Sequence, residues 1–120
     1  MTTGLDLELY KLKAELCKTF ADARRLMIIN CLRDGELSVT DLVVRLEFPQ
    51  GVVSRHLGVL RQRGIVDTRR NGVNVYYRLA DSKIIEACDT VHDLLMQQVA
   101  RNRDLAEKYL TDTMNSKKGA

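Results

Sequence analysis

The 120-residue sequence lacks several features that mark other classes of protein. It has one proline and no low-complexity tract, so a disordered or fibrous chain is not expected. No apolar run approaches the roughly 20 residues needed to cross a membrane. Met1–Gly4 lead directly into an amphipathic pattern and not into a signal peptide. These absences predict a cytoplasmic protein without a membrane partner.

Cysteine is scarce, and its spacing does not suit a disulfide framework or a zinc site. Cys17, Cys31 and Cys88 are odd in number, widely spaced and without the CxxC or Cys/His spacing of a zinc site. We expect free thiols in a reducing compartment. A Gly-rich phosphate loop, a Gly-x-Ser-x-Gly motif and a metal triad are also missing. The sequence therefore predicts neither an enzyme nor a bound metal or cofactor.

Positive charge is concentrated in one part of an otherwise ordinary globular composition. The chain is 45% apolar and 29% charged, with a net charge of +3. Residues 50–80 hold six arginines and one aspartate, a local charge of +5, which leaves −2 for the remainder. A basic segment on a mildly acidic body favours a polyanionic partner. A solvated arginine-rich face is the alternative.

Apolar periodicity predicts four helices in the first half of the chain. A stripe at steps of three and four residues, from Leu5 to Phe20, marks the first. Asp22 is a suitable N-cap for the second, which Asp34-Gly35 ends. Ser38 and Asp41 have the capping-box spacing that begins a short third helix. After a turn at residues 47–49, a fourth helix is expected over residues 50–63, with Gly64 as its stop.

The period then changes from helix to strand and back to helix. Residues 65–70 and 73–79 are rich in β-branched and aromatic side chains, and they flank Asn71-Gly72, a strong signal for a type I′ hairpin turn. Asp81 or Ser82 is expected to cap a last helix that reaches about Tyr109. This helix carries a heptad-like seam, polar at two positions, formed by Ile84, Cys88, Val91, Leu95, Gln98, Asn102, Leu105 and Tyr109.

This order predicts a mostly α-helical fold with a β-hairpin, the signature of a winged helix-turn-helix. We expect one DNA-binding and dimerisation domain over residues 1–110. Residues 111–120 are expected to form a disordered tail.

With these elements in this order, the sequence resembles the ArsR/SmtB family of bacterial repressors. The resemblance runs from about Leu16 to Asp81. It is carried by Phe20–Leu26, Gly35–Leu42, Val53–Arg61, Gly64–Val66, Arg69–Gly72 and Tyr76–Leu79. One departure is Pro49, which stands where the family often has Ser or Thr as N-cap of the recognition helix.

The resemblance implies a transcriptional repressor that binds double-stranded operator DNA as a homodimer, which dimerises through its first and last helices. The fourth helix would enter the major groove, and the hairpin would reach the flanking backbone. An inverted-repeat operator is expected. The predicted DNA-contacting residues are Gln50, Ser54, Arg55, His56, Arg61, Arg69, Arg70 and Asn74. Alternatives remain: Ser54 capping locally, His56 packing on the body, and Arg69 and Arg70 as solvated strand charges.

The sensing sites of the resembled family are not found at their expected positions. Ser38-Val39-Thr40-Asp41 stands where the arsenic type has Cys-Val-Cys-Asp, and hydroxyls are poor soft-metal ligands. Lys83, Leu94 and Gln97 occupy positions of the zinc ligands that accompany Asp81. Asn30 and Met96 stand where the reactive-sulfur branch has its cysteine pair.

The remaining candidates for a signal are the three cysteines. Cys17 lies beside the stripe of the first helix, and Cys88 lies on the seam of the last. This suggests a thiol switch or a soft-metalloid site that uses Cys88 with Cys17 or Cys31, so that a soft metalloid or reactive sulfur species would be the inducer. The alternatives are a ligand-blind regulator with purely structural cysteines and a protein-interaction winged helix.

Overall fold

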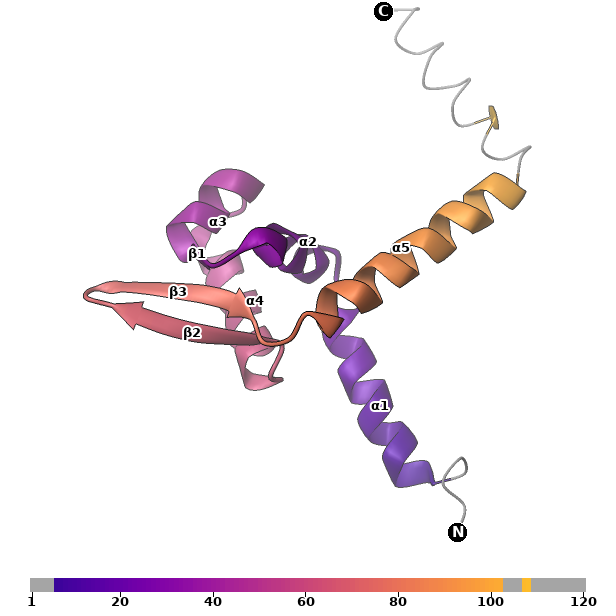
Figure 1. Ribbon diagram of the computed structural model, residues 1–120, viewed down its shortest axis with the longest axis horizontal. Coiled ribbons are helices and arrows are strands. Elements are labelled where there is room, and N and C mark those ends of the chain that lie inside the picture. The colour runs from indigo at the N-terminus through magenta and orange to yellow at the C-terminus, as the bar shows by residue number, and fades with distance from the viewer. Residues whose placement is uncertain (1–5, 103–106, 109–120) are drawn as a thin grey trace, which may run out of the picture. The chain divides into compact units, whose positions relative to one another are not determined.

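The computed structural model describes residues 6–102 and 107–108 of the chain (Figure 1). The elements in chain order are α1 (Leu7–Phe20), α2 (Ala23–Cys31), a 3-10 turn (Leu32–Asp34), β1 (Leu37–Ser38), α3 (Val39–Leu46), α4 (Gln50–Gln62), β2 (Val66–Asn71), β3 (Asn74–Leu79) and α5 (Lys83–Arg101). They fall into two compact units with the boundary after Ile85, inside α5. The predicted winged helix-turn-helix is confirmed, with β1 as an addition.

Helices α2, α3 and α4 enclose the core of the first unit. The buried apolar side chains of the described residues are Ile28, Ile29, Leu32, Leu42, Val53, Leu57, Leu60, Ile65 and Val66. The predicted inner stripe of α4 is confirmed, because Val53, Leu57 and Leu60 have no exposed surface. Full burial of one such side chain contributes about 1.5–3 kcal/mol. This burial fixes which side of α4 faces outward.

The predicted caps of α2 and α3 are confirmed. The Asp22 carboxylate accepts the backbone N–H of Arg24 at 2.9 Å and that of Arg25 at 3.2 Å. In the capping box of α3, Ser38 Oγ accepts the Asp41 N–H at 3.1 Å and the Asp41 carboxylate accepts the Ser38 N–H at 3.0 Å. These bonds lower the pKa of each aspartate. The two helices are therefore fixed at their first residues.

A three-stranded antiparallel sheet, in the order β1-β3-β2, carries the wing. Strand β1 pairs Leu37 with Tyr77 and Ser38 with Tyr76. The sequence gives no sign of this strand, because two residues are too few to show an alternating pattern. The longer pair β2–β3 reaches away from the helices as an arm (Figure 1).

The predicted turn of the wing is wrong by one residue. Asn71 pairs with Asn74, so Gly72 and Val73 are the central residues. Gly72 has a φ of +64°, and Glu47 is the only non-glycine of positive φ in the described part of the chain. Positive φ at the first central residue alone is the type II′ pattern and not type I′. Gly72 takes this position because glycine adopts positive φ without a steric penalty.

The predicted start of α5 is confirmed by Asp81, whose carboxylate accepts the Lys83 N–H at 2.8 Å. The helix ends at Arg101 within residues 6–102. Of the predicted seam, Ile84 and Cys88 are half-buried, and the residues from Val91 to Asn102 are exposed. The expectations for Leu105, for Tyr109 and for the tail 111–120 lie outside the described residues.

The capping box gives a direct test of the local structure of α3. Replacing Ser38 by alanine removes one acceptor at the helix start and is expected to lower the free energy of unfolding by about 1 kcal/mol. Thr40→Ala, an exposed change in the same first turn, should stay within about 0.5 kcal/mol of wild type. Urea unfolding followed by circular dichroism measures both. Equal losses in the two variants would contradict the capping role of Ser38.

Candidate nucleic-acid interface

The outer face of α4 is polar and accessible. Gln50, Ser54, Arg55 and Arg61 are exposed there, opposite the buried apolar stripe. Since successive residues of a helix are about 100° apart, Ser54 lies between the two arginines, about 20° from Arg61 and about 100° from Arg55. Short hydroxyls and guanidinium groups suit base edges and phosphates. The structure thus brings four of the predicted DNA-contacting residues onto one helix face.

Two glycines lie beside Ser54 on this face, between the two arginines. A Cβ atom at Gly51 or at Gly58 would meet no other atom within 4 Å. No contact within the chain therefore requires glycine at either position, although glycine costs an exposed helix about 1 kcal/mol relative to alanine. The result is a shallow central strip of small residues between two cationic edges, which permits close approach of a partner.

Pro49 begins α4 without a side-chain cap, as its chemistry requires. Its φ is −57°, and its carbonyl oxygen accepts the N–H groups of Val52 at 3.0 Å and Val53 at 3.1 Å. The fixed φ of proline suits the first turn of a helix. The departure noted at Pro49 removes a capping hydroxyl but does not disturb the start of α4.

On the wing, Arg69 is engaged within the protein. Its guanidinium forms an ion pair with Glu36, with Nε 3.0 Å from each carboxylate oxygen, and lies 5.0 Å from the centre of the Tyr76 ring. Hydrogen bonding to Arg69 lowers the pKa of Glu36. Arg69 is thus paired within the protein and is not a simple solvated charge, and its contact with DNA stays a prediction. It ties β2 to the segment that leads into β1.

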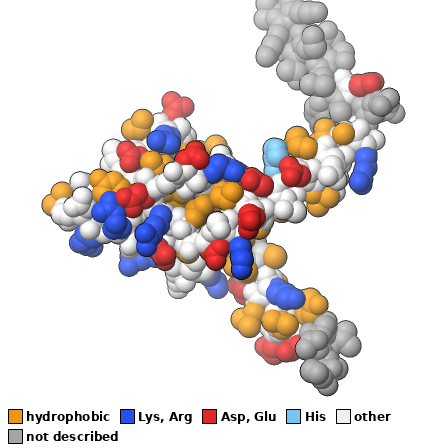
Figure 2. All heavy atoms as spheres, in the orientation of Figure 1, with side chains coloured by type: hydrophobic (Ala, Val, Ile, Leu, Met, Phe, Trp, Pro, Cys, Tyr) orange, Lys and Arg blue, Asp and Glu red, His pale blue; other side chains and the backbone are white. Residues whose placement is uncertain are grey.

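Arg70 and Asn74 lie near the tip of the wing and are exposed. Arg70 pairs with Val75 across the hairpin, and Asn74 pairs with Asn71 beside the turn. Figure 2 shows Lys and Arg side chains gathered over the hairpin arm. Both residues therefore lie near the tip of the hairpin, the part of the wing that is predicted to reach DNA.

His56 does not lie on the outer face of α4. Its side chain belongs to a residue that is only 4% exposed, and it faces α2 near Asp22 and Arg25. The expectation that His56 contacts DNA is therefore wrong for this conformation, because a base cannot reach a buried ring. Packing on the body, the alternative, describes it. A rotation of 100° per residue separates it from Arg55.

The cysteines show no metal site. Cys17 is exposed, Cys31 and Cys88 are half-buried, and none of the three is in a disulfide. Burial raises the pKa of the Cys31 thiol, which makes its thiolate scarcer. No group of three or more His, Cys, Asp or Glu side chains able to hold a metal occurs within residues 6–102 and 107–108.

No helix in the described part of the chain is long and apolar enough to cross a bilayer.

Several residues of this region were not predicted from the sequence. Glu36 acts on the wing through Arg69, and Arg25 contacts the recognition helix through His56. The role of Glu36 could not be predicted from the sequence, because a single acidic residue before a short strand belongs to no repeating pattern. Gly51 and Gly58 carried a readable signal: glycine inside a strongly helical pattern indicates a packing or functional reason.

Comparison with known proteins agrees with this geometry. Residues 22–68 match the family model described as "Bacterial regulatory protein, arsR family". The "Biofilm growth-associated repressor" of Agrobacterium fabrum is 48% identical over 77 residues, which are 62% of this chain and 66% of that protein. The "Transcriptional activator HlyU" of Vibrio cholerae is 40% identical over 82 residues, which are 68% of this chain and 76% of that protein.

A solved structure extends the likeness to three dimensions. The homodimeric winged helix-turn-helix DNA-binding domain of Mb0332 from Mycobacterium bovis superposes with a TM-score of 0.70 at 27% identity, covering 78% of this chain and 86% of that one. The family consists of transcriptional regulators and not of enzymes. With the fold and the helix face described above, these matches show that the chain belongs to the ArsR family of bacterial DNA-binding transcriptional regulators.

Proposed function

We propose that this regulator is a homodimeric, sequence-specific repressor that reads operator DNA with α4. The observation that carries this proposal is the outer face of α4, where small residues form the middle and Arg55 and Arg61 form the edges. In a major groove, the small strip lies against base edges while the arginines reach the phosphates on either side. Gln50 and Ser54 supply hydrogen-bonding groups for the bases.

The wing supplies a second set of contacts. Arg70 and Asn74 bind the flanking backbone or the minor groove, while Arg69 holds the arm through Glu36 and contributes only a partly neutralised charge. Phosphate contacts fix orientation and carry little sequence information. The wing therefore adds affinity, and α4 adds specificity.

Dimerisation is proposed through α1 and α5, because both expose apolar side chains that the small core does not use. On α1, Leu7 is 65% exposed and Leu12 is 69% exposed. On α5, Val91 is 64% exposed, and Leu94 and Leu95 are each 51% exposed. Covering such surface stabilises a short chain. The two-fold symmetry of a dimer matches an inverted repeat with half-sites one helical turn, or a multiple of it, apart.

The signal that releases DNA is proposed to act on the thiols. Cys17 on α1 and Cys88 on α5 lie on the two proposed dimer helices, so a covalent or metalloid bridge would change the dimer geometry. With peroxide, two thiols lose two protons and two electrons to form a disulfide, and the peroxide is reduced to water. A soft metalloid would instead bind the thiolates. Cys31 is a weaker partner for Cys88 than Cys17 is, because burial raises the pKa of the Cys31 thiol and makes its thiolate scarcer.

Two alternatives compete with this proposal. A ligand-blind regulator would use the same DNA-binding face and respond to its own concentration alone. A protein-interaction winged helix would not need the arginines on α4 and the wing. DNA affinity and its dependence on salt and on thiol reagents distinguish the three.

Salt dependence tests the phosphate contacts. Binding to duplex DNA should weaken linearly on a log–log plot against salt, and Arg70→Gln should reduce the slope by about 1, since each lost phosphate contact removes about 0.9 released ions. Fluorescence anisotropy measures both. Arg33→Gln, which removes the same charge beside Asn30 at the far end of α2, is the matched control. The proposal for Arg70 fails if both variants keep the wild-type slope.

Oligomeric state tests the dimer helices. Leu12→Glu or Leu95→Glu places a charge on the proposed interface, where an unpaired buried charge costs several kcal/mol, so the chain should sediment as a monomer. Val44→Glu, at a side chain on α3 that is 71% exposed, should leave the dimer intact. Analytical ultracentrifugation gives the masses. Dimers of the α1 and α5 variants would exclude these helices as the interface.

Serine substitutions test the thiol signal. Wild-type protein bound to its own promoter should be released by at least one of peroxide, polysulfide and As(III), and Cys88→Ser should abolish that release. Cys17→Ser should do the same if Cys17 is the partner, and Cys31→Ser should then respond as wild type. Gel shifts provide the readout. Unchanged release in Cys88→Ser would exclude this signal.

A further inference from the structure

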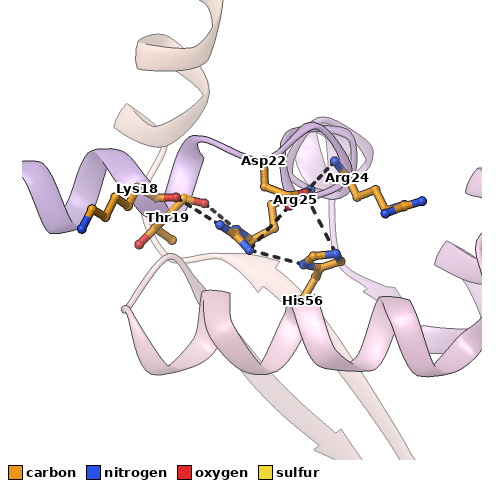
Figure 3. Close-up of polar contacts among 6 residues, drawn as sticks. All are labelled: Lys18, Thr19, Asp22, Arg24, Arg25 and His56. Atoms are coloured by element: carbon orange, nitrogen blue, oxygen red, sulfur yellow. Dashed lines mark hydrogen bonds and ion pairs between the residues drawn. The ribbon is translucent and has the colours of Figure 1, made fainter.

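The guanidinium group of Arg25 on α2 contacts both α1 and α4, on the inner side of α4 (Figure 3). Arg25, in the first turn of α2, donates from Nε to the carbonyl oxygen of Thr19 at 2.7 Å and from a terminal nitrogen to that of Lys18 at 3.0 Å. These carbonyls belong to the last turn of α1, where a cation is favoured by the helix dipole. The other terminal nitrogen lies 3.5 Å from Nδ1 of His56 on α4.

The contact with Arg25 favours a neutral His56. A guanidinium group only donates hydrogen bonds, so a hydrogen bond at this position needs Nδ1 as acceptor and a neutral ring. The ring proton is then on Nε2, which is buried, has no hydrogen-bond partner among the described residues, and lies 4.0 Å from the Asp22 carboxylate. The same carboxylate caps α2. The neutral imidazole thus fits between a donor on one side and a carboxylate on the other.

A second proton on His56 would oppose this arrangement. It would place an N–H on Nδ1 against the donors of Arg25, so the contact between the Arg25 guanidinium and the His56 ring would be lost. Burial lowers the pKa of His56, Asp22 opposes that shift, and the nearby charges of Arg55, Arg25 and Arg24 lower the pKa further. The folded chain therefore binds this proton less readily than the unfolded chain. The corresponding stability is complete above about pH 6.5 and decreases as the pH falls through the lowered pKa.

We propose that Arg25 and neutral His56 form a latch that positions the recognition helix α4 for sequence-specific DNA binding. The latch joins the end of α1 to the inner side of α4, one residue from Arg55 on the outer face. Arg25 and His56 are positioning residues and do not touch DNA. This inference rests on the proposed function of α4 and adds a protonation requirement to it.

The pH dependence of specificity tests the latch. The probe is a duplex selected from random DNA by the wild-type protein at pH 7.5, and the comparison is a scrambled duplex of equal composition. The ratio of the two Kd values removes the effect of general phosphate attraction. As the pH is lowered from 7.5 through the lowered pKa of His56, we expect the wild-type ratio to fall at least about threefold, with about tenfold per pH unit as the limit for one proton.

Variants separate a positioning role from simple packing. The Oδ1 atom of asparagine can replace Nδ1 as an acceptor, and it does not titrate. His56→Asn should therefore keep the ratio of Kd values at pH 7.5 within about threefold of wild type, a smaller change than loss of a hydrogen bond would cause. The ratio for this variant should not fall at pH 5.5. Arg25→Gln should lower the ratio at pH 7.5 and weaken its pH dependence. His92 is the other histidine of the chain, and His92→Gln is the control that should retain the wild-type profile.

The titration of His56 itself gives a readout that needs no substitution. In NMR spectra of the wild-type protein, the His56 ring should carry its proton on Nε2 at pH 7.5, and its titration should coincide with the fall in specificity. Circular dichroism confirms that the chain stays folded at each pH. A pH-independent wild-type ratio, or an unchanged fall in His56→Asn, overturns the latch. Failure to select any duplex instead overturns the proposed function, and the latch with it.

Discussion

The burial of one side of α4 against α2 and α3 is the constraint on which the rest of this protein depends. Val53, Leu57 and Leu60 are completely removed from water, and rotating α4 would expose all three, at a cost of about 1.5–3 kcal/mol each. The helix therefore has one orientation, with Gly51, Ser54 and Gly58 in the middle of its outer face. The same packing turns His56 inward to Arg25. Core formation and DNA-reading geometry are thus two consequences of one helical period.

Six arginines of the described residues fall into two groups with different roles. Arg25, Arg63 and Arg69 contact groups of the protein: the end of α1, Glu15 of α1 and Glu36 before β1, respectively. Arg55, Arg61 and Arg70 are exposed on the outer face of α4 and on the wing. Exposed ion pairs such as that between Arg63 and Glu15 add little stability, but they orient the elements. The local charge of +5 in residues 50–80 therefore overstates the charge that is available to a phosphate backbone.

Features made by residues close together in the sequence were predictable, and features made by distant residues were not. Helix starts at Asp22 and Ser38 were predictable because a cap is made by residues two or three positions apart. The stripe of α4 was predictable because its period repeats. Strand β1, the ion pair between Glu36 and Arg69 and the contact between His56 and Arg25 depend on residues more than 30 positions apart, which no local pattern encodes. The turn of the wing was misplaced because Asn71-Gly72 and Gly72-Val73 both offer a glycine, and strand pairing decided between them.

Amide chemical-shift mapping of the labelled protein, titrated with a selected duplex, tests whether α4 reads DNA with its outer face. We expect the largest changes at Gly51, Ser54, Arg55 and Gly58, with a second set at the wing tip around Arg70 and Asn74. Changes confined to α2 and α3, with the α4 face and the wing unaffected, would contradict it.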